Sequence, residues 1–153
     1  MSQDEIIIDI DEQELDAVRN EFGEIDELDP ALVRKLVICS GKVYYDILEE
    51  RRTRSIHDIA ILRLEQVHPF PLKELREAVA RFPNATEVNW CQEEPKNQGC
   101  WYQISYYLRK ALNERQSLEY VGREASPSPA VGFFKLHVKQ QQQLVNEALS
   151  ILG

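Results

Sequence analysis

Several common signatures are missing from this chain of 153 residues. No apolar run approaches the roughly 20 residues that a membrane-spanning helix needs, and no signal or transit segment precedes the expected fold. A P-loop, the three-glycine dinucleotide fingerprint and the Gly-x-Ser-x-Gly elbow of hydrolases are also missing. We therefore expect a cytoplasmic domain without membrane contact, and the sequence offers no motif of a nucleotide-hydrolysing or serine-hydrolase active site.

Close metal-ligand spacing is missing as well. The three cysteines stand far apart, at Cys39, Cys91 and Cys100. The three histidines lie in a polar turn, a proline turn and a helical pattern, at His57, His68 and His137. Two of the cysteines fall within apolar strand patterns, where cysteine behaves as a small hydrophobic residue. We expect reduced, buried thiols and no metal site.

A basic nucleic-acid footprint is absent, although the charge is unevenly distributed. The net charge is −8, yet residues 1–30 hold twelve acids against the single base Arg19, and the remaining fourteen acids and seventeen bases leave +3. This balance excludes a nucleic-acid-binding surface. We divide the chain into an acidic leader or linker at 1–30 and one domain at 31–153. Apolar residues in the leader predict that part of it packs as a short strand or helix against a partner outside this chain.

Apolar runs and helical spacings alternate along the domain. The runs predict buried strands at 36–39, 59–64, 86–91 and 118–121, whereas apolar residues at helical spacing predict helices at 43–54, 72–82 and 101–112. A last helix is expected to begin at Ser128 or Pro129 and to end near Ser150. Strands that alternate with helices favour a mostly parallel sheet with helices on both faces. The predicted fold class is a three-layer α/β domain.

The turn between the first strand and the first helix of the domain is the first candidate site. Ser40, Gly41 and Lys42 follow a buried strand directly, so the N–H groups that open the helix point beyond the carboxyl end of the sheet, where anions bind. Arg123, just after the fourth strand, is placed to reach the same ligand. The four residues form a hypothetical effector or phosphate site. An ordinary tight turn is the alternative, because the glycines of a P-loop are absent.

A polar segment after the third strand is the second candidate. It contains Gln92, Glu93, Asn97 and Gln98 close to the expected edge of the sheet. Adjacent carboxylates at 93 and 94 can serve acid–base chemistry when one raises the pKa of the other. No nucleophile or cofactor motif accompanies them, so we favour a polar sheet edge or interface and assign no catalytic residue.

Several ordered motifs then point to one family. They are GEIDELDP at 23–30, CSGKVYYD at 39–46, LRLEQ at 62–66, HPFP at 68–71, WCQEEP at 90–95, NQG at 97–99 and SPAVG at 128–132. With these motifs the chain, from about residue 20 to its end, resembles the carboxyl-terminal domain of the first, decarboxylating component of 2-oxoglutarate dehydrogenase. That component is a thiamine-diphosphate enzyme of the citric acid cycle.

The resemblance implies a transketolase carboxyl-terminal-like domain whose mostly parallel sheet carries an antiparallel edge strand. In such enzymes the upstream domains bind thiamine diphosphate and Mg between the protomers of a homodimer, so the resemblance implies no cofactor in this chain and no activity for the chain alone. It implies a role in supporting the dimer, or alternatively in binding AMP or acetyl-CoA as an effector. The location would be the bacterial cytoplasm, or the mitochondrial matrix for a eukaryotic parent.

Overall fold

The computed structural model describes residues 8–10, 28–65, 68–123 and 134–151, with the backbone alone at 8–10 and 134–137. In chain order the elements are β1 (Ile8–Ile10), the 3-10 helix η3 (Pro30–Leu32), β2 (Lys35–Cys39), α2 (Val43–Thr53), β3 (Ile59–Leu64), α3 (Leu72–Ala80), β4 (Glu87–Pro95), α4 (Trp101–Ala111), β5 (Ser117–Arg123) and α5 (Phe134–Ala148).

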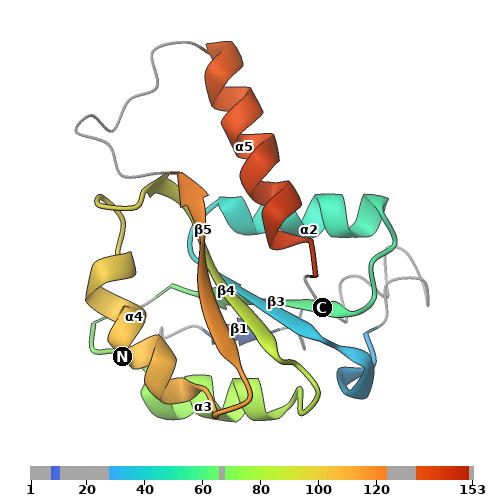
Figure 1. Ribbon diagram of the computed structural model, residues 1–153, viewed down its shortest axis with the longest axis vertical. Coiled ribbons are helices and arrows are strands. Elements are labelled where there is room, and N and C mark those ends of the chain that lie inside the picture. The colour runs from blue at the N-terminus through green and yellow to red at the C-terminus, as the bar shows by residue number, and fades with distance from the viewer. Residues whose placement is uncertain (1–7, 11–27, 66–67, 124–133, 152–153) are drawn as a thin grey trace.

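The strands form one sheet of five, in the order β1-β3-β2-β4-β5 (Figure 1). β2, β3, β4 and β5 are parallel, and β1 pairs with β3 in the antiparallel sense at one edge. All five residues of the central strand β2 are buried, as expected for a strand covered on both faces. The α/β fold class is therefore confirmed, including the antiparallel edge strand.

Helices cover both faces of this sheet, with α2 and α5 on one side and α3 and α4 on the other (Figure 1). Because successive side chains of a strand point to opposite faces, each strand supplies both cores. Val37 and Cys39 join the core beneath α2 and α5, whereas Leu36 and Ile38 join the one beneath α3 and α4. Trp90, fully buried, belongs to the second core.

The largest differences from the sequence prediction concern β4 and β1, and the other boundaries, apart from the start of the last helix, agree within two residues. β4 runs to Pro95, four residues beyond the predicted end, with an irregular register between Cys91 and Pro95. Within the added part of the strand, Gln92 is buried instead of facing solvent. β1 lies within the segment that we predicted to be a leader, and it joins the sheet. The predicted start of the last helix, at Ser128 or Pro129, falls outside the described residues.

Cys39 and Cys91 are buried in β2 and β4, as the strand patterns predict, and Cys100 is partly buried. The structure records no disulfide at any of the three. Burial raises the pKa of the Cys91 thiol to about 12, which keeps that thiol protonated at neutral pH. None of the helices in the described ranges is long and apolar enough to cross a membrane.

Candidate site at the carboxyl end of the sheet

The turn that follows β2 has the geometry expected of a strand feeding a helix. Gly41 adopts a φ of +80°, a left-handed conformation that glycine adopts without a steric penalty. A Cβ placed there would meet nothing within 4 Å, so the backbone conformation, and not crowding, favours glycine. Lys42 stands at the N-cap position of α2, and its side chain makes no capping hydrogen bond to the helix.

The N-terminus of α2 already faces an anion, which belongs to the chain itself. The backbone N–H of Gly41 donates to Oε1 of Glu65 at 3.0 Å. A helix N-terminus favours negative charge, so the Glu65 carboxylate occupies part of the position that a ligand phosphate would take. Sequence reasoning missed this contact because Glu65 is 24 residues away and follows a different strand.

Lys42 is engaged as well. Its ammonium donates to Oε2 of Glu93 at 3.0 Å, with the Lys42 side chain 78% exposed and that of Glu93 16% exposed. The hydrogen bond to Glu93, followed by the carboxylate charge, raises the pKa of Lys42, while the positive charge of Arg123 lowers it. The structure thus brings Lys42, Arg123 and Glu93 together, although they come from three different parts of the chain.

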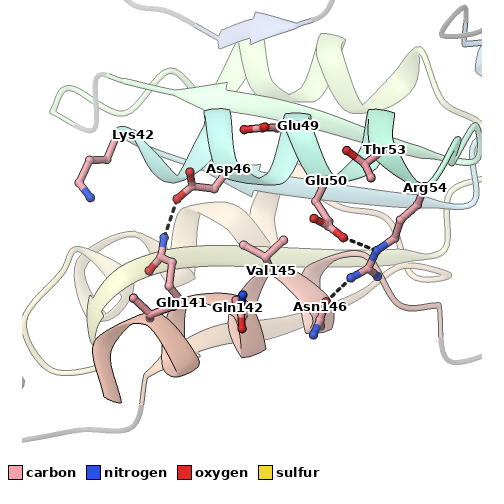
Figure 2. A pocket seen from close by; sticks show the side chains of 11 residues that line it. Lys42, Asp46, Glu49, Glu50, Thr53, Arg54, Gln141, Gln142, Val145 and Asn146 are labelled. Atoms are coloured by element: carbon pink, nitrogen blue, oxygen red, sulfur yellow. Dashed lines mark hydrogen bonds and ion pairs between the residues drawn. The ribbon is translucent and has the colours of Figure 1, made fainter. Parts of the chain in front are cut away.

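The side-chain amide of Gln141 on α5 links Arg123 on β5 to Asp46 on α2. Arg123 is the last residue of β5, and its Nη2 donates to Oε1 of Gln141 on α5 at 3.2 Å. Nε2 of Gln141 in turn donates to Oδ2 of Asp46 on α2 at 2.8 Å (Figure 2). An amide suits this position because it accepts from a cation and donates to an anion at once. Nothing in the sequence around Gln141 predicted this role.

A groove of about 630 Å³ lies between α2 and α5 beside this link. Figure 2 shows Asp46, Glu49 and Glu50 on the α2 side and Gln141, Gln142 and Asn146 on the α5 side. Arg54 donates to Glu50 at 2.7 Å and also to Asn146. With three acids against Lys42 and Arg54, the lining carries one excess negative charge. An anionic ligand here would compete with carboxylates already present.

The second candidate cluster separates into residues with different surroundings. Gln92 is buried, where Oε1 accepts from the Trp90 indole N–H at 2.8 Å and Nε2 donates to the carbonyls of Glu94 and Pro95, each at 3.0 Å. Asn97 and Gln98 are exposed in the turn that follows β4. Gln92 therefore organises the backbone of this segment, whereas the two turn residues lie at the surface.

Within the described ranges, no three His, Cys, Asp or Glu side chains gather closely enough to hold a metal ion.

The fold and the motifs at its carboxyl edge define an α/β domain of the transketolase carboxyl-terminal type. The family described as "2-oxoglutarate dehydrogenase C-terminal" matches residues 9–149, and the chain belongs to that family. The match begins upstream of residue 20, where the motif resemblance starts, and it includes part of the acidic leader.

Individual relatives agree with this assignment. The chain is 53% identical over 129 residues to the 2-oxoglutarate dehydrogenase E1 component of Haemophilus influenzae, 49% identical over 130 residues to that of Coxiella burnetii and 47% identical over 131 residues to that of Azotobacter vinelandii. Each alignment covers 84% of this chain but only 14% of the relative. The chain therefore corresponds to a small part of a much larger E1 subunit.

Proposed function

We propose that this chain is the non-catalytic carboxyl-terminal domain of a 2-oxoglutarate dehydrogenase E1 component, and that it supports assembly of the dimeric subunit. The observation that carries the proposal is the extent of the similarity, since most of this chain matches about one seventh of each relative. The decarboxylation of 2-oxoglutarate in the citric acid cycle, with thiamine diphosphate and Mg, belongs in this proposal to the rest of the subunit. We place that enzyme in the bacterial cytoplasm, because the three relatives described above are bacterial.

An aromatic face on α4 supports the assembly role. Tyr102 and Tyr106 are 61% and 59% exposed, and Tyr107 is also exposed while it stacks on Phe70 with ring centroids 5.1 Å apart. Lys110 places its ammonium 4.9 Å from the centre of the Tyr106 ring. Exposed tyrosines are enriched in protein interfaces. In our proposal this tyrosine face contacts the remainder of the E1 subunit.

Complementation tests the assembly role. The Haemophilus influenzae E1 component, truncated to remove the matching segment, is expected to lose its dimeric state and its 2-oxoglutarate decarboxylase activity. Adding this chain in trans should restore both, and the Tyr102→Ala/Tyr106→Ala double variant should restore about tenfold less at the same concentration. Lys139→Ala, an exposed change on α5, serves as the control and should behave as the unchanged chain. A truncated subunit that remains fully dimeric and active would contradict the proposal.

A second candidate function is the binding of an adenine nucleotide or acetyl-CoA at Ser40, Gly41, Lys42 and Arg123. The observation that favours it is the closeness of Lys42 and Arg123, whose charges influence each other. Two cations beside a helix N-terminus suit a phosphate. The carboxylates of Glu65 and Glu93 oppose it, because both already occupy the donors that a phosphate would need.

Lys42→Ala separates the two functions. Because the Lys42 side chain is 78% exposed, the substitution is expected to lower the free energy of unfolding by less than about 1 kcal/mol. Its raised pKa means that this small contribution is present below pH 10.5 and is lost as the pH rises further. Calorimetry with AMP and with acetyl-CoA should detect no binding to either form of the chain. Saturable binding that Lys42→Ala weakens about tenfold would instead establish the effector role.

A further inference from the structure

A second hollow, of about 420 Å³, lies at the amino ends of the parallel strands, away from the site described above. Its lining comes from β2, β4, β5 and the end of α5, and it shares no residue with the groove between α2 and α5. Lys35 faces Glu87 across one strand pair, and Asn89 faces Glu119 across the next. The family motifs quoted above do not include these residues.

Asn89 is the residue that points to a ligand. Val88 and Trp90 enter the core beneath α3 and α4, so strand alternation directs Asn89 to the opposite face, where it lines the hollow. Asn89 is only 5% exposed, and its Oδ1 is buried with no hydrogen-bond partner among the described residues. Buried polar atoms in folded proteins are nearly always paired. The described residues supply no hydrogen-bond donor to this oxygen, so a ligand could supply one.

The charges around the hollow specify what kind of donor fits. Three carboxylates line it, from Glu87, Glu119 and Glu147, against the single ammonium of Lys35. That ammonium is already directed at backbone carbonyls, since Nζ donates to the carbonyl oxygens of Glu147, at 3.1 Å, and of Ser150. Both carbonyls lie at the C-terminal end of α5, which carries partial negative charge. The hollow therefore has an excess of acceptors and a net negative lining.

We propose that this hollow binds an organic cation with several N–H donors, a guanidinium or a primary ammonium group. The cation donates to Oδ1 of Asn89, while Glu119 and Glu147 balance its charge. A bare metal ion fits poorly, because within the described part of the chain no three carboxylate, thiol or imidazole side chains converge. A volume of about 420 Å³ also falls in the range of about 300–1,000 Å³ typical of sites for organic ligands. The group is carried either by a free amine or by a side chain of another polypeptide.

Calorimetric titration of the whole chain with two probes tests the proposal. Agmatine presents the guanidinium on a small amine, and acetyl-Gly-Arg-Gly-amide presents it on a peptide. The matched neutral peptide carries citrulline in place of arginine. Saturable binding of at least one guanidinium probe is expected, at least tenfold tighter than citrulline binding and weaker at high salt. The probe that binds more tightly indicates whether the cation belongs to a free amine or to a side chain of another polypeptide.

Three variants locate the binding at this hollow. Glu119→Gln and Glu147→Gln, both at exposed positions, should each weaken binding about threefold to tenfold. Asn89→Leu should abolish binding and at the same time raise the melting temperature, because it removes a buried oxygen without a partner. Glu114→Gln, exposed in the loop after α4, is the control and should change neither quantity.

Three results would overturn the proposal. They are equal binding of the citrulline peptide, no binding of either guanidinium probe, and binding that both glutamine substitutions leave unchanged. The two glutamine variants keep the test decisive even where Asn89→Leu fails to fold, because they alter exposed side chains. None of these outcomes bears on the complementation of the truncated E1 subunit, so the assembly role stands or falls separately.

Discussion

Gln92→Ala is expected to lower the free energy of unfolding by about 3–5 kcal/mol, a large effect for a polar residue. The substitution leaves the Trp90 indole N–H and the carbonyls of Glu94 and Pro95 without their partner. Each buried polar group left unpaired costs about 1–3 kcal/mol. Urea denaturation measures the change directly, provided that the unfolding slope stays constant.

Matched variants identify the cause of that loss. Gln92→Glu keeps the shape but replaces the donating amide nitrogen with an oxygen, so it should also be destabilising. Gln142→Ala, an exposed change on α5, should lie within about 0.5 kcal/mol of the unchanged chain. A loss below about 1 kcal/mol for Gln92→Ala would show that Gln92 does not hold this segment together, and an interface role for the residue would then become the better interpretation.

Gly99 packs closely against the side-chain amide of Gln92. A Cβ at this position would lie 2.6 Å from the side-chain amide of Gln92, and a contact that short forces one of the two groups to move. The amide is held by three hydrogen bonds, so its displacement breaks some of them. The motifs WCQEEP and NQG, which carried the resemblance to the family, thus contain residues that pack on one another.

The sequence was sufficient to predict the layered fold, because its signals are local. Continuous apolar runs such as Leu36–Cys39 are typical of strands buried on both faces, and prolines and glycines separated these runs from the helices. Positions with an unexpected environment were harder to predict. Arg51, a charged residue within the helix predicted at 43–54, is fully buried on α2, where Nη1 donates to the carbonyl of Ile59 at 3.3 Å.

For the candidate site, the sequence predicted where the residues lie but not which side chains they contact. Parallel strands bring Gly41, Lys42 and Arg123 to one edge of the sheet, and that expectation follows from topology alone. The partners of these residues follow from side-chain contacts between distant segments, such as Glu65 with Gly41 and Gln141 with Arg123. No spacing rule connects residues 24 or 18 positions apart on different elements. The charge balance at this edge therefore became visible only in three dimensions.

Lys35 is a further position that the pattern did not single out, and its substitution should have the second large effect. The side chain is 2% exposed in the central strand, and its ammonium donates to the carbonyls of Glu147 and Ser150 at the end of α5. Lys35→Ala removes these charge-assisted hydrogen bonds together with a buried aliphatic stem. We expect a loss of about 2–4 kcal/mol in the free energy of unfolding, measured by urea denaturation.

The pH dependence of stability tests whether the Lys35 ammonium is held inside the fold. Burial lowers its pKa below 10.5, although nearby Glu87 acts in the opposite sense. As the pH rises through that lowered pKa towards 10.5, the unfolded chain retains more protons than the folded chain, so stability should increase.

Cys91 has the opposite effect, because its raised pKa makes stability fall between about pH 9 and 12. The comparison therefore belongs in a Cys91→Ala background, where Lys35→Met should remove the alkaline rise while it keeps the buried stem. A rise that persists in the Lys35→Met variant would mean that another group causes it, and the ammonium would then be no more desolvated in the folded chain than in the unfolded one.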